Sequence, residues 1–284
     1  SIKPAIVYVS GWQDLAYLSV VKELRRAGVP VVTGFDDQWL GTLRQHLASV
    51  LFPLLRRRYY SHAWVAGPYQ FEYARRLGFR RNEIIHNLLT CNQQLFSAGA
   101  AFLAEKRNEY PKRFVYVGNF RYIKGTDILA ESFKFYRNEL GGRWGLVCVG
   151  NGEMRHVLDA VPGITVLDFL PQEKLVELAK SAGAFILPSR RDQWGVVVHE
   201  FACAGLPLIL SENVGAAPVF LIDHFNGRKF TGNSAEELAR IMKAVSDEPD
   251  EKLWQMGMNS CVLGTQISPY TSAASLMSIA RVKK

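Results

Sequence analysis

Residues 184–217 read AFILPSRRDQWGVVVHEFACAGLPLILSENVGAA. An apolar run ends at Pro188, a polar loop follows, and a helical apolar pattern begins after Gly195. A second short apolar run, LPLILSE, starts at residue 206. Two strand patterns joined by a helical one predict a parallel βα unit, because parallel strands need a crossover connection.

The same alternation extends along the chain in both directions. Strands are expected at 5–9, 29–33, 62–67, 83–87, 113–119, 144–152, 163–169, 184–189 and 206–212. Helical patterns separate them, and the longest covers 40–58. We therefore expect an α/β fold of two Rossmann-like doubly wound domains.

A polar, helical stretch at 98–112 is the expected linker between the domains. It predicts an N-terminal domain over 1–110 and a C-terminal domain over 111–268. A further helix is expected over 269–284.

The composition argues against a disordered or fibrous chain. The 284 residues are 48% hydrophobic and 21% charged, as in a folded globular protein. Four scattered cysteines and six histidines show no metal-ligand spacing, so we expect no metal site and a reducing cytosol. Residues 1–110 hold 14 Lys and Arg against 8 Asp and Glu, which indicates acidic partners. No nucleic-acid-binding motif occurs, so nucleic acid is not an expected partner.

Two carboxylates stand out in the opening stretch. Asp192 follows a predicted strand, at the edge where doubly wound sheets bind ligands, and Glu200 lies in the next helix. Carboxylates accept hydrogen bonds from sugar hydroxyls, while Gly195 and the first helix amides can face a phosphate. The alternatives are that Asp192 is a loop or helix-capping acid and that Glu200 is a solvated helix residue.

Several motifs in a fixed order resemble those of the retaining GT-B glycosyltransferases of family 4. That family has an acidic residue, seven residues, Glu, small residues and G-x-P, matched here by Asp192, Glu200 and residues 203–207. Its G-R-x-x-x-x-K-G motif resembles GNFRYIKG at 118–125, and its V-G-x-G motif matches 149–152. The resemblance is close over 113–232.

This chain departs from the family pattern at several positions. Asn119 replaces the usual Arg, with Arg121 nearby as a substitute, and Asp192 replaces the usual Glu. Residue 1 aligns after the family's Gly-rich first βα unit. Asp36 stands near the position of a family His.

The resemblance implies a GT-B fold with an interdomain cleft, a shortened, incomplete N-terminal domain, and a last helix that returns to that domain. It implies a metal-independent hexosyltransferase that moves a sugar, with retention, from a nucleoside diphosphate sugar to a carbohydrate or lipid-linked acceptor. The expected role is surface polysaccharide or glycolipid synthesis. The sugar nucleotide is a substrate, so no cofactor is expected.

The family's site residues carry over by motif. Lys124, Asp192 and Glu200 are the implied catalytic residues, and Asp36 is the implied acceptor-side residue. The implied donor contacts are Gly118, Asn119, Arg121, Lys124, Gly150, Leu170, Ser189, Gly195, Val196, Val197 and Glu200.

Residues 40–60 combine an apolar helical face with a terminal run of three arginines and two tyrosines, RRRYY at 56–60. This pattern suits an anionic membrane surface and a peripheral location on the cytoplasmic membrane. The alternative is that the apolar face packs on its own sheet.

Two other classes of function stay open. One is a non-catalytic family member that binds a nucleotide sugar or partners an active transferase, and donor binding without transfer would identify it. The other is a nicotinamide-dependent oxidoreductase on a similar sheet, which binding of NAD(P) would identify.

Overall fold

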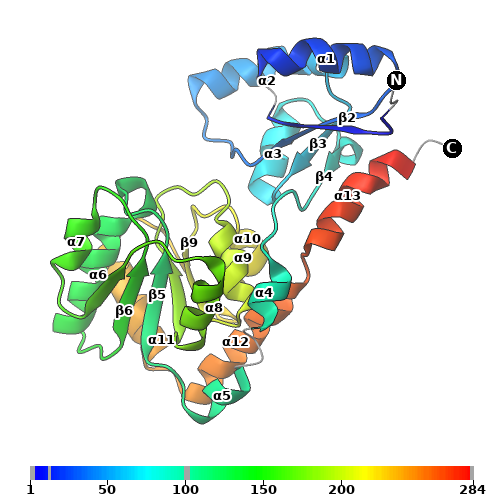
Figure 1. Ribbon diagram of the computed structural model, residues 1–284. Coiled ribbons are helices and arrows are strands. Elements are labelled where there is room, and N and C mark those ends of the chain that lie inside the picture. The colour runs from blue at the N-terminus through cyan, green and yellow to red at the C-terminus, as the bar shows by residue number, and fades with distance from the viewer. Residues whose placement is uncertain (1–3, 12–13, 99–102, 282–284) are drawn as a thin grey trace. The chain divides into compact units, whose positions relative to one another are not determined.

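A computed structural model describes residues 4–11, 14–98 and 103–281 (Figure 1). The chain forms two compact units, each built on a parallel sheet with helices around it, which confirms the expected α/β fold class. Unit 1 runs to Thr90 and resumes at Ile267, and unit 2 runs from Cys91 to Gln266. Within the described ranges, no helix is both long and apolar enough to cross a membrane.

Unit 1 contains a four-stranded sheet in the order β1-β2-β3-β4. Its strands are β1 (Val7–Ser10), β2 (Val31–Phe35), β3 (His62–Val65) and β4 (Ile84–Ile85). Its helical segments are α1 (Leu15–Arg26), α2 (Leu43–Leu55), η1 (Arg56–Arg58), α3 (Pro68–Arg76), η2 (Arg81–Glu83) and α13 (Pro269–Arg281).

Alternate residues of this sheet enter two separate apolar clusters, as the two-residue period of a strand requires. Val31 and Ala63 pack with side chains of α1, α2 and α3. Val32 and Trp64 pack on the opposite face, against Ile279 of α13. The last helix therefore covers the second face of the unit 1 sheet.

Unit 2 contains a six-stranded parallel sheet in the order β10-β9-β8-β5-β6-β7. Its strands are β5 (Arg113–Val117), β6 (Gly145–Val149), β7 (Ile164–Leu167), β8 (Ala184–Leu187), β9 (Leu208–Ser211) and β10 (Gly227–Phe230). Its helical segments are α4 (Gln93–Ala98), α5 (Leu103–Asn108), η4 (Tyr122–Lys124), α6 (Thr126–Asn138), α7 (Arg155–Asp159), α8 (Gln172–Lys180), α9 (Val196–Cys203), α10 (Ala217–Phe220), α11 (Ala235–Ser246) and α12 (Asp250–Thr265).

The strand order of unit 2 reverses between β5 and β8. Successive strands run from β5 through β6 to β7 on one side, and from β8 through β9 to β10 on the other. This is the doubly wound order, in which ligands bind at the carboxyl ends of the strands beside the reversal. Every residue of β8 and β9 is buried, as expected for parallel strands covered on both faces.

The boundary between the units lies before the one expected at residue 110. The described helix of the expected linker, α5, packs on α12 of unit 2, and residues 99–102 of that linker lie outside the described ranges. Lys106 of α5 is buried and donates hydrogen bonds to the carbonyls of Ala179 (2.7 Å) and Ala182 (2.8 Å), at the end of α8. The indole of Trp254 donates to the carbonyl of Leu103 at 2.8 Å. These contacts cannot be read from the polar composition of the segment.

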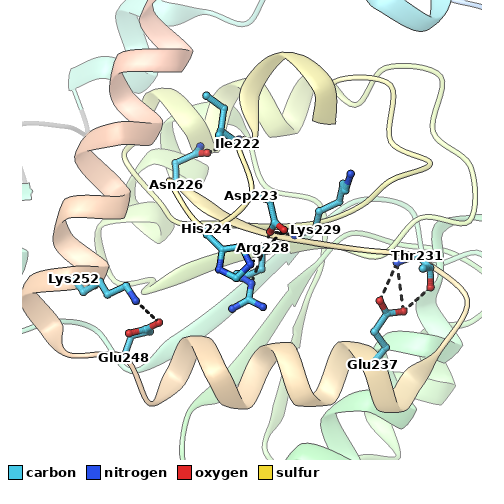
Figure 2. Close-up of polar contacts among 10 residues, drawn as sticks. All are labelled: Ile222, Asp223, His224, Asn226, Arg228, Lys229, Thr231, Glu237, Glu248 and Lys252. Atoms are coloured by element: carbon cyan, nitrogen blue, oxygen red, sulfur yellow. Dashed lines mark hydrogen bonds and ion pairs between the residues drawn. The ribbon is translucent and has the colours of Figure 1, made fainter.

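A turn held by side chains leads into β10, the edge strand that the sequence analysis does not predict (Figure 2). The side chain of Asn226 accepts a hydrogen bond from the amide of Ile222 at 2.8 Å. The carboxylate of Asp223 accepts one from the amide of Lys229 at 3.0 Å. The strand's own residues, GRKF, lack the apolar run that marks the other strands of this sheet.

Gly125 joins η4 to α6 and contacts the segment that follows β8. Its φ of +71° lies in the left-handed region, and a Cβ at this position would lie 2.1 Å from the carbonyl oxygen of Pro188. The close approach therefore requires glycine for two independent reasons.

We expect Gly125→Ala to destabilise the protein by clearly more than the roughly 1–2 kcal/mol that left-handed backbone costs an ordinary residue. Gly141→Ala is the matched control, because Gly141 has a φ of +64° and a Cβ added there would meet nothing within 4 Å. Chemical denaturation of both variants measures the difference. Equal losses of stability would show that the contact with Pro188 imposes no constraint.

Candidate functional site

A cavity of about 640 Å³ lies at the carboxyl ends of the central strands of unit 2. The last residues of β5, β6 and β8 form part of its wall, so it lies beside the reversal of strand order. Its lining consists of Val117, Gly118, Asn119, Lys124, Val149, Gly150, Asn151, Phe169, Leu170, Gln172, Leu175, Leu187, Asp192, Gly195, Val196, Val197 and Glu200.

Lys124 and Asp192 meet at this cavity although 68 positions separate them in the chain. Lys124 ends η4, and Asp192 lies in the loop after β8. The Nζ of Lys124 is 2.7 Å from Oδ2 of Asp192, and their side chains are 25% and 11% exposed. The pair therefore places one cation and one carboxylate on the same wall.

A second ion pair fixes the loop that carries Asp192. Arg190 donates two hydrogen bonds of 2.6 Å to the carboxylate of Asp127, in the first turn of α6. The guanidinium also lies 3.7 Å from the centre of the Tyr122 ring. The hydrogen bonds from Arg190 raise its own pKa, because they favour the charged form. This double contact joins the loop to both η4 and α6.

The loops after β5 and β6 are joined along the floor of the cavity. The amide of Gly118 donates to the carbonyl of Val149 at 3.0 Å, and that of Phe120 donates to Asn151 at 2.9 Å. A Cβ at Gly150 would lie 2.0 Å from the carbonyl oxygen of Gly118. The V-G-x-G motif therefore permits two backbone loops to touch.

The first turn of α9 faces the cavity. Gly195 precedes the helix, and Val196 and Val197 belong to its first turn; all three line the cavity. Amides in the first turn of a helix have no acceptor within the helix and carry the positive end of its dipole. An anion in the cavity would meet these donors.

Glu200 is 7% exposed, so it is not a solvated helix residue. One of its carboxylate oxygens accepts a hydrogen bond of 3.1 Å from the side-chain amide of Gln172. Burial raises the pKa of Glu200, and the hydrogen bond from Gln172 opposes that rise in part. Gly195 rather than Asp192 caps α9, which also leaves the helix-capping alternative for Asp192 without support.

His199, next to Glu200, has a structural role. Its Nδ1 accepts a hydrogen bond from the amide of Cys91 (3.1 Å), and its Nε2 lies 2.9 Å from the carbonyl of Gly264, to which it donates. The thiols of Cys91 and Cys203 are 3.8 Å apart beside it. These three side chains could form a metal-ligand group by distance alone. In this arrangement both ring nitrogens are occupied by backbone groups, which removes the histidine as a ligand.

Three of the predicted site residues do not line the cavity. The side chain of Arg121 is 59% exposed, lies 3.5 Å from Glu153 and is not among the lining residues. Ser189 is fully buried and is not among the lining residues. Asp36 follows β2 in unit 1. The other ten predicted residues all line the cavity.

Sequence reasoning missed three polar or aromatic residues of the lining. Asn151 is the variable residue of the V-G-x-G motif, and Gln172 begins α8 after Pro171. Phe169 is 78% exposed although it is large and apolar. The position of Phe169 and Gln172 after the third strand of a doubly wound sheet was the signal that could have identified them.

The segment of sequence that contains this cavity matches a known protein family. The family described as Glycosyl transferases group 1 matches residues 101–260. A D-inositol 3-phosphate glycosyltransferase of Streptomyces coelicolor is 30% identical over 151 residues, which are 48% of this chain and 33% of that protein. A glycogen synthase of Mycobacterium tuberculosis is 29% identical over 156 residues, 52% of this chain and 37% of that protein. The matched segments thus span about a third of these relatives.

Solved structures with the same fold cover both units. Anabaena HepE in complex with UDP superposes with a TM-score of 0.74 at 15% identity, over 97% of this chain and 76% of that chain. A trehalose-6-phosphate structure from E. coli with bound UDP-2-fluoro glucose gives a TM-score of 0.72 at 12% identity, over 98% and 73% of the two chains. The likeness shows the GT-B fold class of two parallel-sheet domains.

The family match covers more than half of the chain and includes the whole lining of the cavity. The chain therefore belongs to the glycosyl transferases group 1 family.

Proposed function

We propose that this protein is a retaining glycosyltransferase of family 4 that transfers a sugar from a nucleoside diphosphate sugar to an acceptor hydroxyl. The observation that carries the proposal is the gathering of Lys124, Asp192 and Glu200 around one cavity at the start of α9. Membership in the glycosyl transferases group 1 family supports the same chemistry. Related folds solved with UDP or UDP-glucose make a uridine diphosphate sugar the first donor to test.

The diphosphate of the donor would lie between Lys124 and the first turn of α9. Its negative charge increases as the bond to the anomeric carbon breaks, and donors that are already in place stabilise that charge in the transition state. The ammonium of Lys124 and the amides of Val196 and Val197 are such donors. Because these groups supply the positive charge, we propose that the reaction needs no metal ion or cofactor.

The hydroxyl groups of the donor would meet the two carboxylates. Glu200 would accept hydrogen bonds from the ribose, with Gln172 holding the carboxylate in place, and Asp192 would accept from the transferred sugar. An ionised carboxylate has enough lone pairs to accept from two hydroxyls at once. Phe169 and Leu170 offer apolar surface to the base.

In a reaction without a covalent glycosyl-enzyme intermediate, retention requires the acceptor to attack from the side on which the diphosphate leaves. We propose that the acceptor oxygen bonds to the anomeric carbon as the bond to the diphosphate oxygen breaks. The acceptor's proton passes to that leaving oxygen. The charge on the diphosphate falls by this transfer, so no side chain is needed as a general base.

We propose that the acceptor is a carbohydrate or a lipid-linked sugar, and that the product belongs to a surface polysaccharide or glycolipid. The four cysteines are free thiols, as expected for a protein of the reducing cytoplasm. Residues 40–60 would bring the protein to the membrane surface as a peripheral protein.

One observation favours a second candidate, a nucleotide-sugar-binding protein that does not catalyse transfer. Arg121 lies beside Glu153, so among the described lining residues Lys124 is the one cation. Donor binding without transfer or donor hydrolysis would identify this candidate.

Lys124→Ala should lower the rate of sugar transfer by a hundredfold or more, which corresponds to about 3 kcal/mol of lost transition-state stabilisation. The side chain is a quarter exposed, so the variant should fold and melt much as the wild type does. A radiolabelled-donor transfer assay measures the loss.

Lys252→Ala is the matched control, because Lys252 also forms an ion pair, with Glu248, but is distant in sequence from every lining residue. It should retain full transfer. Wild-type turnover by the Lys124 variant would overturn the assignment of the diphosphate to this lysine.

Glu200→Ala should weaken nucleotide binding by roughly ten- to a hundredfold, because each hydrogen bond to a charged group contributes about 1.5–3 kcal/mol. Calorimetric titration with the nucleoside diphosphate and its 2′,3′-dideoxy analogue isolates the ribose. The wild type should prefer the hydroxylated ligand, and the variant should bind both alike. A variant that keeps the preference would remove Glu200 from the ribose site.

A further inference from the structure

The outer face of α2 in unit 1 is apolar and exposed. Leu43, Leu47, Val50, Leu51 and Leu54 recur at helical spacing on one side of the helix. They are exposed by between 57% and 84%, and α2 contains no buried residue. We call these five residues the α2 face.

The α2 face is not the side of the helix that packs on the sheet. Ala48 and Phe52 perform that role, because they join the cluster formed with α1 and α3. The alternative that the apolar pattern of this helix covers its own sheet therefore accounts for two residues and leaves the α2 face unexplained.

A cluster of cations lies where α2 ends. A hollow of about 510 Å³ there is lined by Lys22, Arg25 and Arg26 of α1 and by Arg57 and Arg58 of η1. We call these five residues the basic cluster. None of them forms an ion pair within the part of the chain that the structure describes, and no acidic side chain is among the lining residues.

A neighbouring cavity of about 560 Å³ extends the basic surface. It shares Arg25 and Arg57 with the first hollow and adds the hydroxyl of Ser61. Its one carboxylate, Glu83, is paired with the buried Arg56 at 2.5 Å. The positive charge of the basic cluster is therefore left uncompensated in both hollows.

The two features are continuous along the chain, since η1 begins at the residue after the end of α2. An apolar helix face beside several cations is the pattern of helices that lie in the interface of an anionic membrane. A second copy of this chain would bring the same cations and no complementary charge to the contact. Anionic lipid offers both an apolar layer and phosphate groups.

We propose that unit 1 docks on a membrane that contains anionic phospholipids, with the α2 face at the boundary of the acyl chains and the basic cluster bound to lipid phosphates. This docking rests on the proposed function, which gives the protein a peripheral place at a membrane, and it adds the class of lipid that is bound. Ser61 and the hollows lie at the amino edge of the sheet, whereas Asp36 follows β2 at the carboxyl edge. Lipid phosphate and an acceptor near Asp36 would therefore occupy opposite edges of unit 1.

Flotation of the full chain with lipid vesicles tests the proposal without any donor present. The wild type should float with phosphatidylcholine vesicles that contain phosphatidylglycerol, and should float much less with phosphatidylcholine alone. Arg57→Glu with Arg58→Glu should lower partitioning to the anionic vesicles by roughly tenfold or more, because each cation near such a surface contributes to binding. Lys134→Glu with Arg143→Glu, two exposed cations of unit 2, is the matched control and should float as the wild type does.

Leu47→Gln with Leu51→Gln tests the apolar part in the same assay. It should reduce flotation with anionic vesicles, while Val262→Gln, an exposed apolar site on α12, should not. Thermal melting of each variant checks that it is folded, which is expected because every altered side chain is exposed.

Three results would overturn the docking proposal. They are equal flotation with neutral and anionic vesicles, unchanged flotation of the Arg57 and Arg58 variant, and a wild-type dimer that the Leu47 and Leu51 variant converts to a monomer. The failure of the docking proposal can be told apart from the failure of the transferase proposal. A protein that transfers sugar but does not float contradicts only the docking, and one that floats but does not transfer contradicts only the chemistry.

Discussion

The candidate site depends on the ion pair between Lys124 and Asp192. The two side chains come from different βα units, one from the loop after β5 and one from the loop after β8. Because strand order reverses between these strands, their loops diverge over the sheet and leave a crevice between them. The ion pair spans that crevice, and the contact of Gly125 with Pro188 brings the two loops close enough for it to form.

The pair also explains how a lysine that would bind an anion can have its charge balanced within the protein. Asp192 compensates the charge of Lys124, and the Arg190–Asp127 pair holds the loop in position. In the proposed reaction the ammonium of Lys124 would pair with the diphosphate, and the carboxylate of Asp192 would accept a hydrogen bond from a sugar hydroxyl. Exchange of one partner for another costs less than creation of a buried, unpaired charge.

Much of unit 2 could be predicted because its strands are continuous apolar runs and its motifs keep fixed spacing. One cavity is lined by residues of the V-G-x-G motif together with Lys124, Asp192 and Glu200, as the sequence analysis expects of a common site. Long-range contacts could not be predicted. Arg121 was expected at the donor, but Glu153 lies beside it; Lys106 looked like part of a polar linker, but two carbonyls at the end of α8 bind it. The exposure of the α2 face also depends on tertiary packing, since periodicity shows that a helix has an apolar face but not what covers it.

The most direct test of the account is a thermal-shift panel of UDP-, GDP- and ADP-sugars, with the matching nucleosides, on the wild type and on Lys124→Ala. One sugar nucleotide should stabilise the wild type, by about 2.7 kcal/mol at a hundred times its dissociation constant. Most of that gain should disappear in the variant, while the weaker effect of the nucleoside stays the same. Equal stabilisation of both proteins by the sugar nucleotide would contradict the claim that Lys124 binds the diphosphate.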